Sequence, residues 1–311
     1  MTKKAFFYID DVIWVFRDLT RQRPASMFDN PFLKLMKQGH DLYGMNVQLN
    51  VFYRTDFFYG NDEFTLADMT DAYKAEWEEA SDWLKLGFHA KQEFPDYPWV
   101  NASYEDVRDV LEDVKREVLR FAGEKTFART VVPHWNPISK AGIRALKDGG
   151  IKLTSMTYGK AEEYNGDPSS LPYGHAGRLL QNRQPETKVY LRNTKDTAAA
   201  RSLCAYNHFD EEEAARTYLN LKTLEDPETG MHFSRLACGL CLNLNTLGEV
   251  EETITSFVGH EYVGYGTHEQ YFYEDYYNYQ PEYPAKVLKA AEIMHNNGYT
   301  YLFPEDLVSA E

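Results

Sequence analysis

The stretch FFYIDDVIWVF, residues 6–16, places two adjacent carboxylates, Asp10 and Asp11, inside an otherwise apolar run. Residues 5–9 are typical of a buried strand, so both carboxylates stand at its carboxyl end if the strand ends near Ile9. Burying two carboxylates without partners is costly, and active sites of parallel α/β folds lie at this end of the strands. The stretch therefore predicts an active site, with a helix cap or a turn as the alternative.

Further short apolar runs alternate with amphipathic stretches along the chain. The runs typical of strands are residues 46–53, 83–88, 130–132, 151–156, 236–244, 262–265 and 299–303. The stretches typical of helices have recognisable ends: Ser103 with Asp106 forms a capping box before a helix that Gly123 ends, Ser139 caps a second helix, and Pro284 begins a third that Gly298 ends. Strands that alternate with helices predict a mostly parallel sheet.

The number of such units fits a (β/α) barrel. An open doubly wound sheet is the alternative, but the chain has no Gly-rich phosphate loop of the kind that often accompanies that fold. We expect a single α/β domain over residues 1–311. Residues 160–228 are polar and irregular, and we interpret them as an excursion from the barrel that covers the site.

Charge and hydropathy argue against two classes of partner. The formal net charge is −15 and no basic stripe is present, which argues against nucleic acid because phosphate backbones bind clustered Lys and Arg. No stretch approaches the ~18 uncharged apolar residues that span a membrane. The first apolar run is broken by two Asp residues, unlike a signal peptide. We therefore expect a cytoplasmic protein that binds neither nucleic acid nor membrane.

The cysteines Cys204, Cys238 and Cys241 are odd in number in a long chain, which argues against a disulfide framework. Cys238 and Cys241 form a CxxC, but no second pair is present to complete a zinc site. Both lie in the apolar residues 236–244. We therefore interpret them as small residues of a strand.

Ionisable residues follow other predicted strands as well. They are His89 with Glu93 four positions later, His134 with Trp135, and His268 with Glu269. An apolar strand followed by a residue of metal-ligand or acid/base type is thus a repeated pattern, which favours one shared site. Two carboxylates with two or three imidazoles suit a divalent metal such as Zn²⁺ with an open position for water. The remaining carboxylate and imidazole can then act as base and acid.

At these positions the chain resembles the polysaccharide deacetylase superfamily, the NodB-like or family 4 carbohydrate esterases. Tyr8-Ile9-Asp10-Asp11 stands where the family has Thr-Phe-Asp-Asp. The resemblance implies a distorted seven-stranded barrel, with Asp10 as the catalytic base and Asp11 as a metal ligand. Gly266-Thr267-His268 is similar to the family's Leu-x-His, which implies that His268 is the general acid.

The middle motifs of the family are altered. The family's His-x-x-x-His ligand pair corresponds here to His89 followed by Glu93, so the resemblance carries over only His89 as a ligand. Either Glu93 or His134 completes the ligand set, and we favour His134 because it directly follows a strand. The family's Arg-Pro-Pro has its nearest counterpart in residues 133–137, PHWNP, which contain no Arg. Trp135 and Glu93 are candidates for a ligand or a substrate contact.

The sequence therefore favours a metal-dependent hydrolase that removes an N- or O-acetyl type group from a carbohydrate or a related amide or ester, with zinc as the expected metal. Glu269 would orient His268 or contact substrate. One alternative is a metal-independent glycoside hydrolase that uses Asp10 or Asp11 with Glu93 or Glu269. Another is a catalytically silent carbohydrate-binding protein. Residues 268–283, HEQYFYEDYYNYQPEY, form either a platform that stacks on sugar rings or the packing of a loop.

Overall fold

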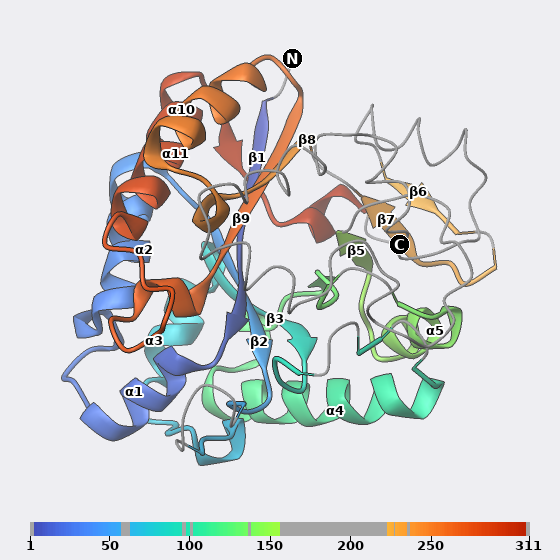
Figure 1. Ribbon diagram of the computed structural model, residues 1–311. Helices are drawn as coiled ribbons and strands as arrows, with labels where there is room; N and C mark the ends of the chain where they lie inside the picture. The colour runs from blue at the N-terminus through green and yellow to red at the C-terminus, as the bar shows by residue number, and fades with distance from the viewer. Residues whose placement is uncertain are drawn as a thin grey trace.

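The computed structural model describes residues 3–56, 63–94, 98–99, 102–135, 138–155, 223–226, 228–234 and 237–308. Its main sheet is parallel and has the strand order β3-β2-β1-β9-β8, with β10 paired to β1 (Figure 1). The strands are β1 (Lys4–Val12), β2 (Val47–Phe52), β3 (Leu84–Ala90), β8 (Ala237–Cys241), β9 (Tyr262–His268) and β10 (Thr300–Tyr301). The central strand β1 is almost wholly buried, as its apolar sequence predicts.

A second, smaller sheet has the order β4-β5-β7-β6. Its strands are β4 (Thr130–Val131), β5 (Leu153–Ser155), β6 (Leu224–Glu225) and β7 (His232–Ser234), and only the pair β6–β7 is antiparallel. A single parallel bridge from Leu86 to Phe127 connects β3 to the segment before β4. Within the described ranges the strands thus form two sheets, and the mostly parallel α/β fold is confirmed.

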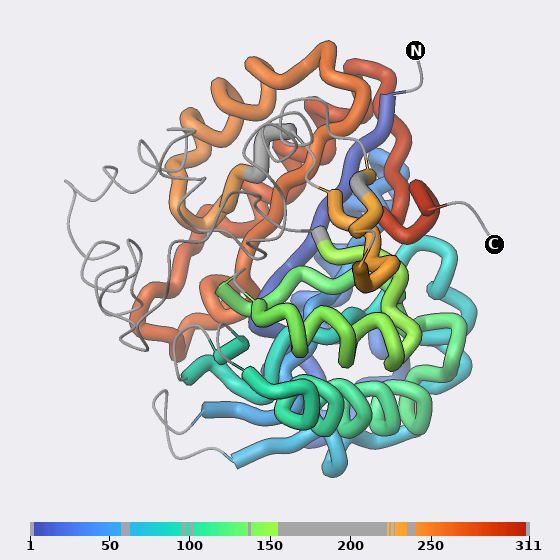
Figure 2. Tube along the Cα trace, turned by 90° about the vertical axis from the view of Figure 1, so that its right-hand side faces the viewer, coloured from blue at the N-terminus to red at the C-terminus, as the bar shows by residue number. Residues whose placement is uncertain are grey.

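Helices cover the sheets on the outside. They are α1 (Trp14–Gln22), α2 (Pro31–Tyr43), α3 (Lys74–Glu79), α4 (Tyr104–Phe121), α5 (Lys140–Asp148), α10 (Leu247–Ser256) and α11 (Tyr283–Asn296). In Figure 1, α2, α10 and α11 lie together on one side of the main sheet, and α4 lies along β3 and packs against α5; Figure 2 shows the same arrangement from the side. Ser103 and Ser139 cap α4 and α5 as predicted.

Every predicted strand coincides with an observed strand, but the ends differ. Strand β1 continues through Asp10 and Asp11 to Val12, and β3 and β9 include His89 and His268. The residues expected beyond these three strands are therefore part of the strands themselves, whereas His134 lies in the turn after β4, as predicted. The pairing of β1 with β2 shifts register between Ile9 and Val12, which is a local bulge of the kind often found beside functional sites.

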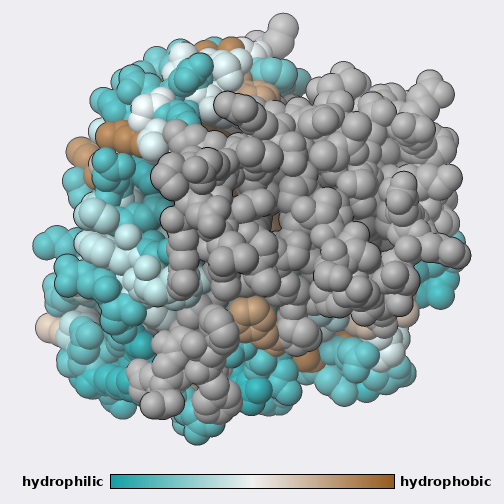
Figure 3. Space-filling model, in the orientation of Figure 1, coloured by the Kyte–Doolittle hydropathy of each residue, from teal (hydrophilic) through white to brown (hydrophobic). Residues whose placement is uncertain are grey.

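The surface and the expected excursion complete the description. None of the helices in the described ranges has both the length and the apolar character needed to cross a bilayer. On the face shown in Figure 3, the described residues are mostly hydrophilic and hydrophobic residues form small patches. Most of the excursion expected at residues 160–228, with Cys204, lies outside the described residues.

Candidate metal centre

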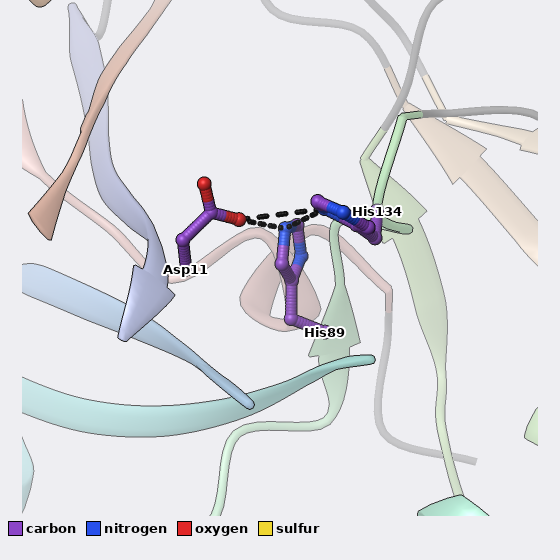
Figure 4. Close-up of side chains that lie close together, drawn as sticks. All are labelled: Asp11, His89 and His134. Carbon is purple, nitrogen blue, oxygen red and sulfur yellow. Dashed lines mark hydrogen bonds and ion pairs between the residues drawn. The ribbon is translucent and has the colours of Figure 1, made fainter. Parts of the chain in front are cut away.

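Three side chains from different parts of the fold meet at the carboxyl ends of the strands. Asp11 extends from the end of β1, His89 from the end of β3, and His134 from the turn after β4 (Figure 4). Oδ1 of Asp11 lies 3.2 Å from Nε2 of His89 and 3.4 Å from Nδ1 of His134. The two imidazole nitrogens are 3.1 Å apart. All three side chains are buried, and they are the three residues that the sequence proposes as ligands.

The outer nitrogens of the two imidazoles are held by the backbone. Nδ1 of His89 donates to the carbonyl of Val132 at 2.6 Å, and Nε2 of His134 donates to the carbonyl of Glu93 at 2.9 Å. When both rings are neutral, the inner nitrogens therefore carry no proton and direct their lone pairs toward each other. Such second contacts fix the tautomer of a ligating His. The inner edge of the pair requires a proton or a cation.

The carboxylate of Asp11 reinforces this requirement. Its Oδ1 is buried between the two imidazoles, while its Oδ2 accepts a hydrogen bond from Nε2 of Gln270 at 2.9 Å. Burial opposes ionisation, but the neighbouring His268, His134 and His89 hold the pKa of Asp11 well below its usual range. Burial lowers the pKa of His134, whereas burial opposes the charged form of His89 but Asp10 and Asp11 raise the pKa of His89. A carboxylate oxygen and two imidazole nitrogens thus face one another in a buried space. The imidazoles favour ionised Asp11 only while they carry a proton, and a bound cation can take the place of that proton.

The spacing of the three donor atoms matches a tetrahedral metal ion. Zinc binds imidazole nitrogen and carboxylate oxygen at about 2.0–2.2 Å, and ligand atoms in a regular tetrahedron at such bond lengths lie about 3.3–3.6 Å apart. The observed edges of 3.1, 3.2 and 3.4 Å fall close to this range. A divalent ion held by Asp11, His89 and His134 would keep a fourth position for water or substrate, as catalytic zinc ions do.

Asp10 is held by a chain of neutral amides. Its Oδ1 accepts from Nδ2 of Asn50 at 2.6 Å, and Oδ1 of Asn50 accepts from Nε2 of Gln48 at 2.7 Å. Gln48 also donates to the carbonyl of Thr130 at 3.0 Å. A Cβ at Gly87 would lie 2.7 Å from Nε2 of Gln48 and 2.8 Å from Oδ1 of Asn50. The amides of Gln48 and Asn50 thus occupy the space beside Gly87 that any larger side chain at this position would need.

His268 approaches the cluster from β9, where it is the register partner of Asp10. Its Nδ1 lies 3.0 Å from Oδ1 of Asn243, an acceptor, so Nδ1 carries a proton and Nε2 faces Oδ2 of Asp11 at 3.9 Å. Sγ of Cys241 lies 3.4 Å from the same Nδ1 and donates to Asn243 at 2.9 Å. The side chain of His268 is 18% exposed, which gives the imidazole access to a ligand in the site.

Glu269, the neighbour of His268, turns away from the cluster. Its Oε2 accepts from the backbone N–H groups of Ile13 and Trp14 at 2.7 and 2.8 Å, and its Oε1 accepts from that of Val15 at 2.7 Å. The hydroxyl of Tyr273 donates to Oε1 at 3.3 Å. Burial raises the pKa of Glu269 to about 7, although the three amides favour its ionised form. The carboxylate of Glu269 thus caps the N-terminus of α1.

Glu93 and Trp135 lie beside the cluster. The segment after His89 leaves β3 at Ala90 and bends, so the helical turn that would bring Glu93 toward a common metal with His89 is not formed. Glu93 contributes its backbone carbonyl to His134, and its side chain is not in the group of facing donors. Trp135 has a φ of 64° and its ring centroid lies 6.0 Å from that of His134. The geometry thus favours His134 over Glu93 as the third ligand.

Several residues around the site are not identified by the sequence patterns. They are Gln48, Asn50, Cys241, Asn243 and Gln270. Gln48 and Asn50 alternate with apolar residues in the fully buried strand β2, and this alternation is a signal for two amides on one face. Asn243 and Gln270 follow strands in turn sequences where amides are common, so no pattern distinguishes them. Cys241 belongs to the CxxC, for which the sequence predicts ordinary strand residues.

The aromatic segment after His268 mainly packs. Tyr271, Tyr276 and Tyr283 are buried, whereas Tyr277 and Tyr279 are 39% and 37% exposed. Tyr279 also lines a cavity of about 400 Å³ between α1, the start of α2 and the start of α11. Packing therefore accounts for most of the segment, and a smaller exposed part remains available for ligand contact.

Comparisons with known proteins identify structures with a similar fold but assign the chain to no family. No family model matches the sequence, and no curated protein matches it. A 4-alpha-glucanotransferase from Thermococcus litoralis has a TM-score of 0.52 at 11% identity, over 99% of this chain and 40% of that chain. A protein from Mycobacterium smegmatis described as a polysaccharide deacetylase has a TM-score of 0.52 at 8% identity, over 96% of this chain and 86% of that chain. The chain thus spans less than half of the glucanotransferase, and both likenesses concern the fold alone.

Proposed function

We propose that this protein is a metal-dependent hydrolase that removes an N- or O-acetyl type group from a carbohydrate or a related amide. The observation that carries the proposal is the buried triangle of Asp11, His89 and His134, whose inner atoms face one another while the outer nitrogens are held by backbone carbonyls. Zinc fits this donor set best. A bound zinc ion would supply a Lewis acid for the acyl carbonyl and would lower the pKa of water.

Asp10 and His268 have the positions required of a base and an acid. Asp10 follows directly after β1's apolar run, and Asn50 fixes one of its oxygens, so the carboxylate can take a proton from an attacking water beside the metal ligands. His268 presents Nε2 to the site because Asn243 accepts from Nδ1. A proton held on Nε2 can pass to the leaving amine or alcohol, and the two groups lie opposite each other in register.

The fold supports the proposal at a coarser level. Its parallel strands place the candidate site at their carboxyl ends, where the active sites of parallel α/β folds lie. Solved structures with a similar fold include a glucanotransferase and a protein described as a polysaccharide deacetylase. We extend the proposal to a distorted barrel of one domain and to a cytoplasmic location. The glycoside hydrolase alternative is weaker, because the carboxylate of Glu269 is bonded to the start of α1 and does not face the Asp pair.

Metal content tests the ligand set first. Protein purified without chelator and without added metal is analysed by elemental mass spectrometry, as wild type, His89→Ala and His40→Ala. His40 is a matched control because its ring stacks on Trp83 away from the cluster. We expect about one divalent ion per chain in wild type and His40→Ala and none in His89→Ala. A wild type that holds no ion and takes none up on titration with Zn²⁺ refutes the proposal.

Acetate release tests the chemistry. The metal-loaded wild type and Asp10→Asn are assayed with N-acetylated and O-acetylated oligosaccharides. We expect release by wild type and a loss of about 10²–10⁴-fold in Asp10→Asn with the metal retained. Binding of these sugars without release by wild type would instead identify a catalytically silent carbohydrate-binding protein.

A further inference from the structure

Helix α1 begins without a capping side chain of its own. Its N-cap residue is Ile13, which makes no side-chain hydrogen bond, and its first turn contains no acidic residue. By contrast, α4, α5 and α10 are capped locally by Ser103, Ser139 and Thr246, which are typical N-cap residues. The N–H groups at the start of α1 donate instead to Glu269, which lies 256 positions after Ile13 in the sequence.

This long-range bond lies next to the metal ligand Asp11. We call the hydrogen bonds from the N–H groups of Ile13, Trp14 and Val15 to Glu269 the clamp. Only Val12 separates Asp11 from Ile13, so the clamp restricts the backbone position of Asp11. Asp11 has a φ of 62°, a left-handed conformation that an L-residue holds only when its surroundings favour it. Gln270, directly after Glu269, donates to Oδ2 of the same Asp11. Glu269 therefore holds the backbone turn after Asp11, and Gln270 holds the Asp11 side chain.

The chemistry of the clamp exceeds what helix capping requires. Glu269 is fully buried, and ionising a buried carboxylate is costly, whereas an exposed Ser or Thr caps a helix without that cost. The carboxylate instead accepts from three consecutive amides, more than one hydroxyl can hold. We propose that Glu269 is a positioning residue for the metal ligand Asp11, and that it sets the affinity of the site for a divalent ion. The assignment rests on the proposed metal site.

Zinc affinity measured by competition with a chromophoric chelator tests this role in wild type, Glu269→Gln and Glu305→Gln. Glu305 is a matched control because it is also a buried carboxylate that accepts from a backbone N–H, that of Arg129, and from Lys85. Loss of a group that holds a metal ligand in place typically weakens metal binding about 10–100-fold, and Glu269 acts on Asp11 through the backbone that begins at Ile13. We expect that loss in Glu269→Gln and wild-type affinity in Glu305→Gln. Equal affinity in wild type and Glu269→Gln overturns the role of Glu269, whereas a wild type without affinity overturns the metal site itself.

Amide hydrogen exchange in the wild type tests the same role without a variant. Coupling between two sites is reciprocal. If the clamp increases the affinity for zinc, bound zinc must therefore also stabilise the hydrogen bonds of the clamp. We expect Zn²⁺ to slow exchange at the N–H groups of Ile13, Trp14 and Val15 and to leave that of Asp106, which Ser103 caps in α4, unchanged. Exchange at the three α1 amides that does not respond to bound zinc contradicts the proposal.

Discussion

Replacing Glu269 by Gln removes a buried carboxylate whose pKa differs between the folded and unfolded chains. Burial raises the pKa of Glu269 to about 7 from an ordinary 4.5. The folded chain therefore retains a proton between these pH values that the unfolded chain releases, so this group stabilises the fold fully below pH 4.5 and loses that contribution as pH rises through 7. Between pH 5 and pH 8, the linkage amounts to about 2.5 kcal/mol of unfolding free energy.

Urea denaturation of chelator-treated wild type and Glu269→Gln at pH 5, 6, 7 and 8 measures this contribution. Gln does not titrate, and the other ionisable groups are common to both proteins, including Asp18 and Arg17 on α1 and Tyr273 and Tyr283 on the facing segments. The difference in unfolding free energy, wild type minus variant, should fall by about 2.5 kcal/mol from pH 5 to pH 8, with equal urea slopes. A difference that stays flat or rises with pH refutes the assignment of a raised pKa.

Other substitutions test the ligands and the amides around the site. His134→Ala should abolish stoichiometric metal, whereas Glu93→Gln should keep it; elemental analysis of both variants distinguishes these candidates for the third ligand. Asn50→Ala removes the amide that holds the base, so kcat for acetate release should fall about 10–100-fold at unchanged metal content. Gly87→Ala crowds two buried amides and should cost about 1–3 kcal/mol in urea denaturation, whereas Gly248→Ala, with open space around its Cβ, should not destabilise the fold.

The strands and the helices α4, α5 and α11 were predictable because they depend on local sequence, whereas α1, α2, α3 and α10 were not identified from the sequence. Burial of a strand on both faces demands a continuous apolar run, and each such run became a strand. The short strands β6 and β7 were missed because residues 223–226 and 231–234 contain no continuous apolar run. Whether strands close into one barrel or form two sheets depends on pairing between distant segments, which apolar runs do not encode. The bridge from Leu86 to Phe127 is such a long-range feature.

The candidate metal ligands could be chosen from the sequence because packing alone rarely places ionisable residues at the ends of apolar strands. Their partners could not, because an Asn or Gln in a turn looks the same whether it faces water or a carboxylate. Glu269 shows the limit most clearly. Its place beside His268 predicts that it orients His268 or contacts substrate, but β9 ends at His268 and the next side chain leaves on the other side of the backbone. There it meets the start of α1.

The two adjacent carboxylates of the first strand can serve one site only because the strand is irregular there. In a regular strand, successive side chains point to opposite faces. Here Oδ1 of Asp10 lies 3.9 Å from Nδ1 of His89, and Oδ1 of Asp11 lies 3.2 Å from Nε2 of the same ring. The register shift after Ile9 and the left-handed backbone at Asp11 bring both carboxylates to one imidazole. Such a backbone conformation costs about 1–2 kcal/mol. The contacts of Glu269 with the N–H groups that follow this turn, and of Gln270 with the Asp11 side chain, stabilise this conformation and offset that cost.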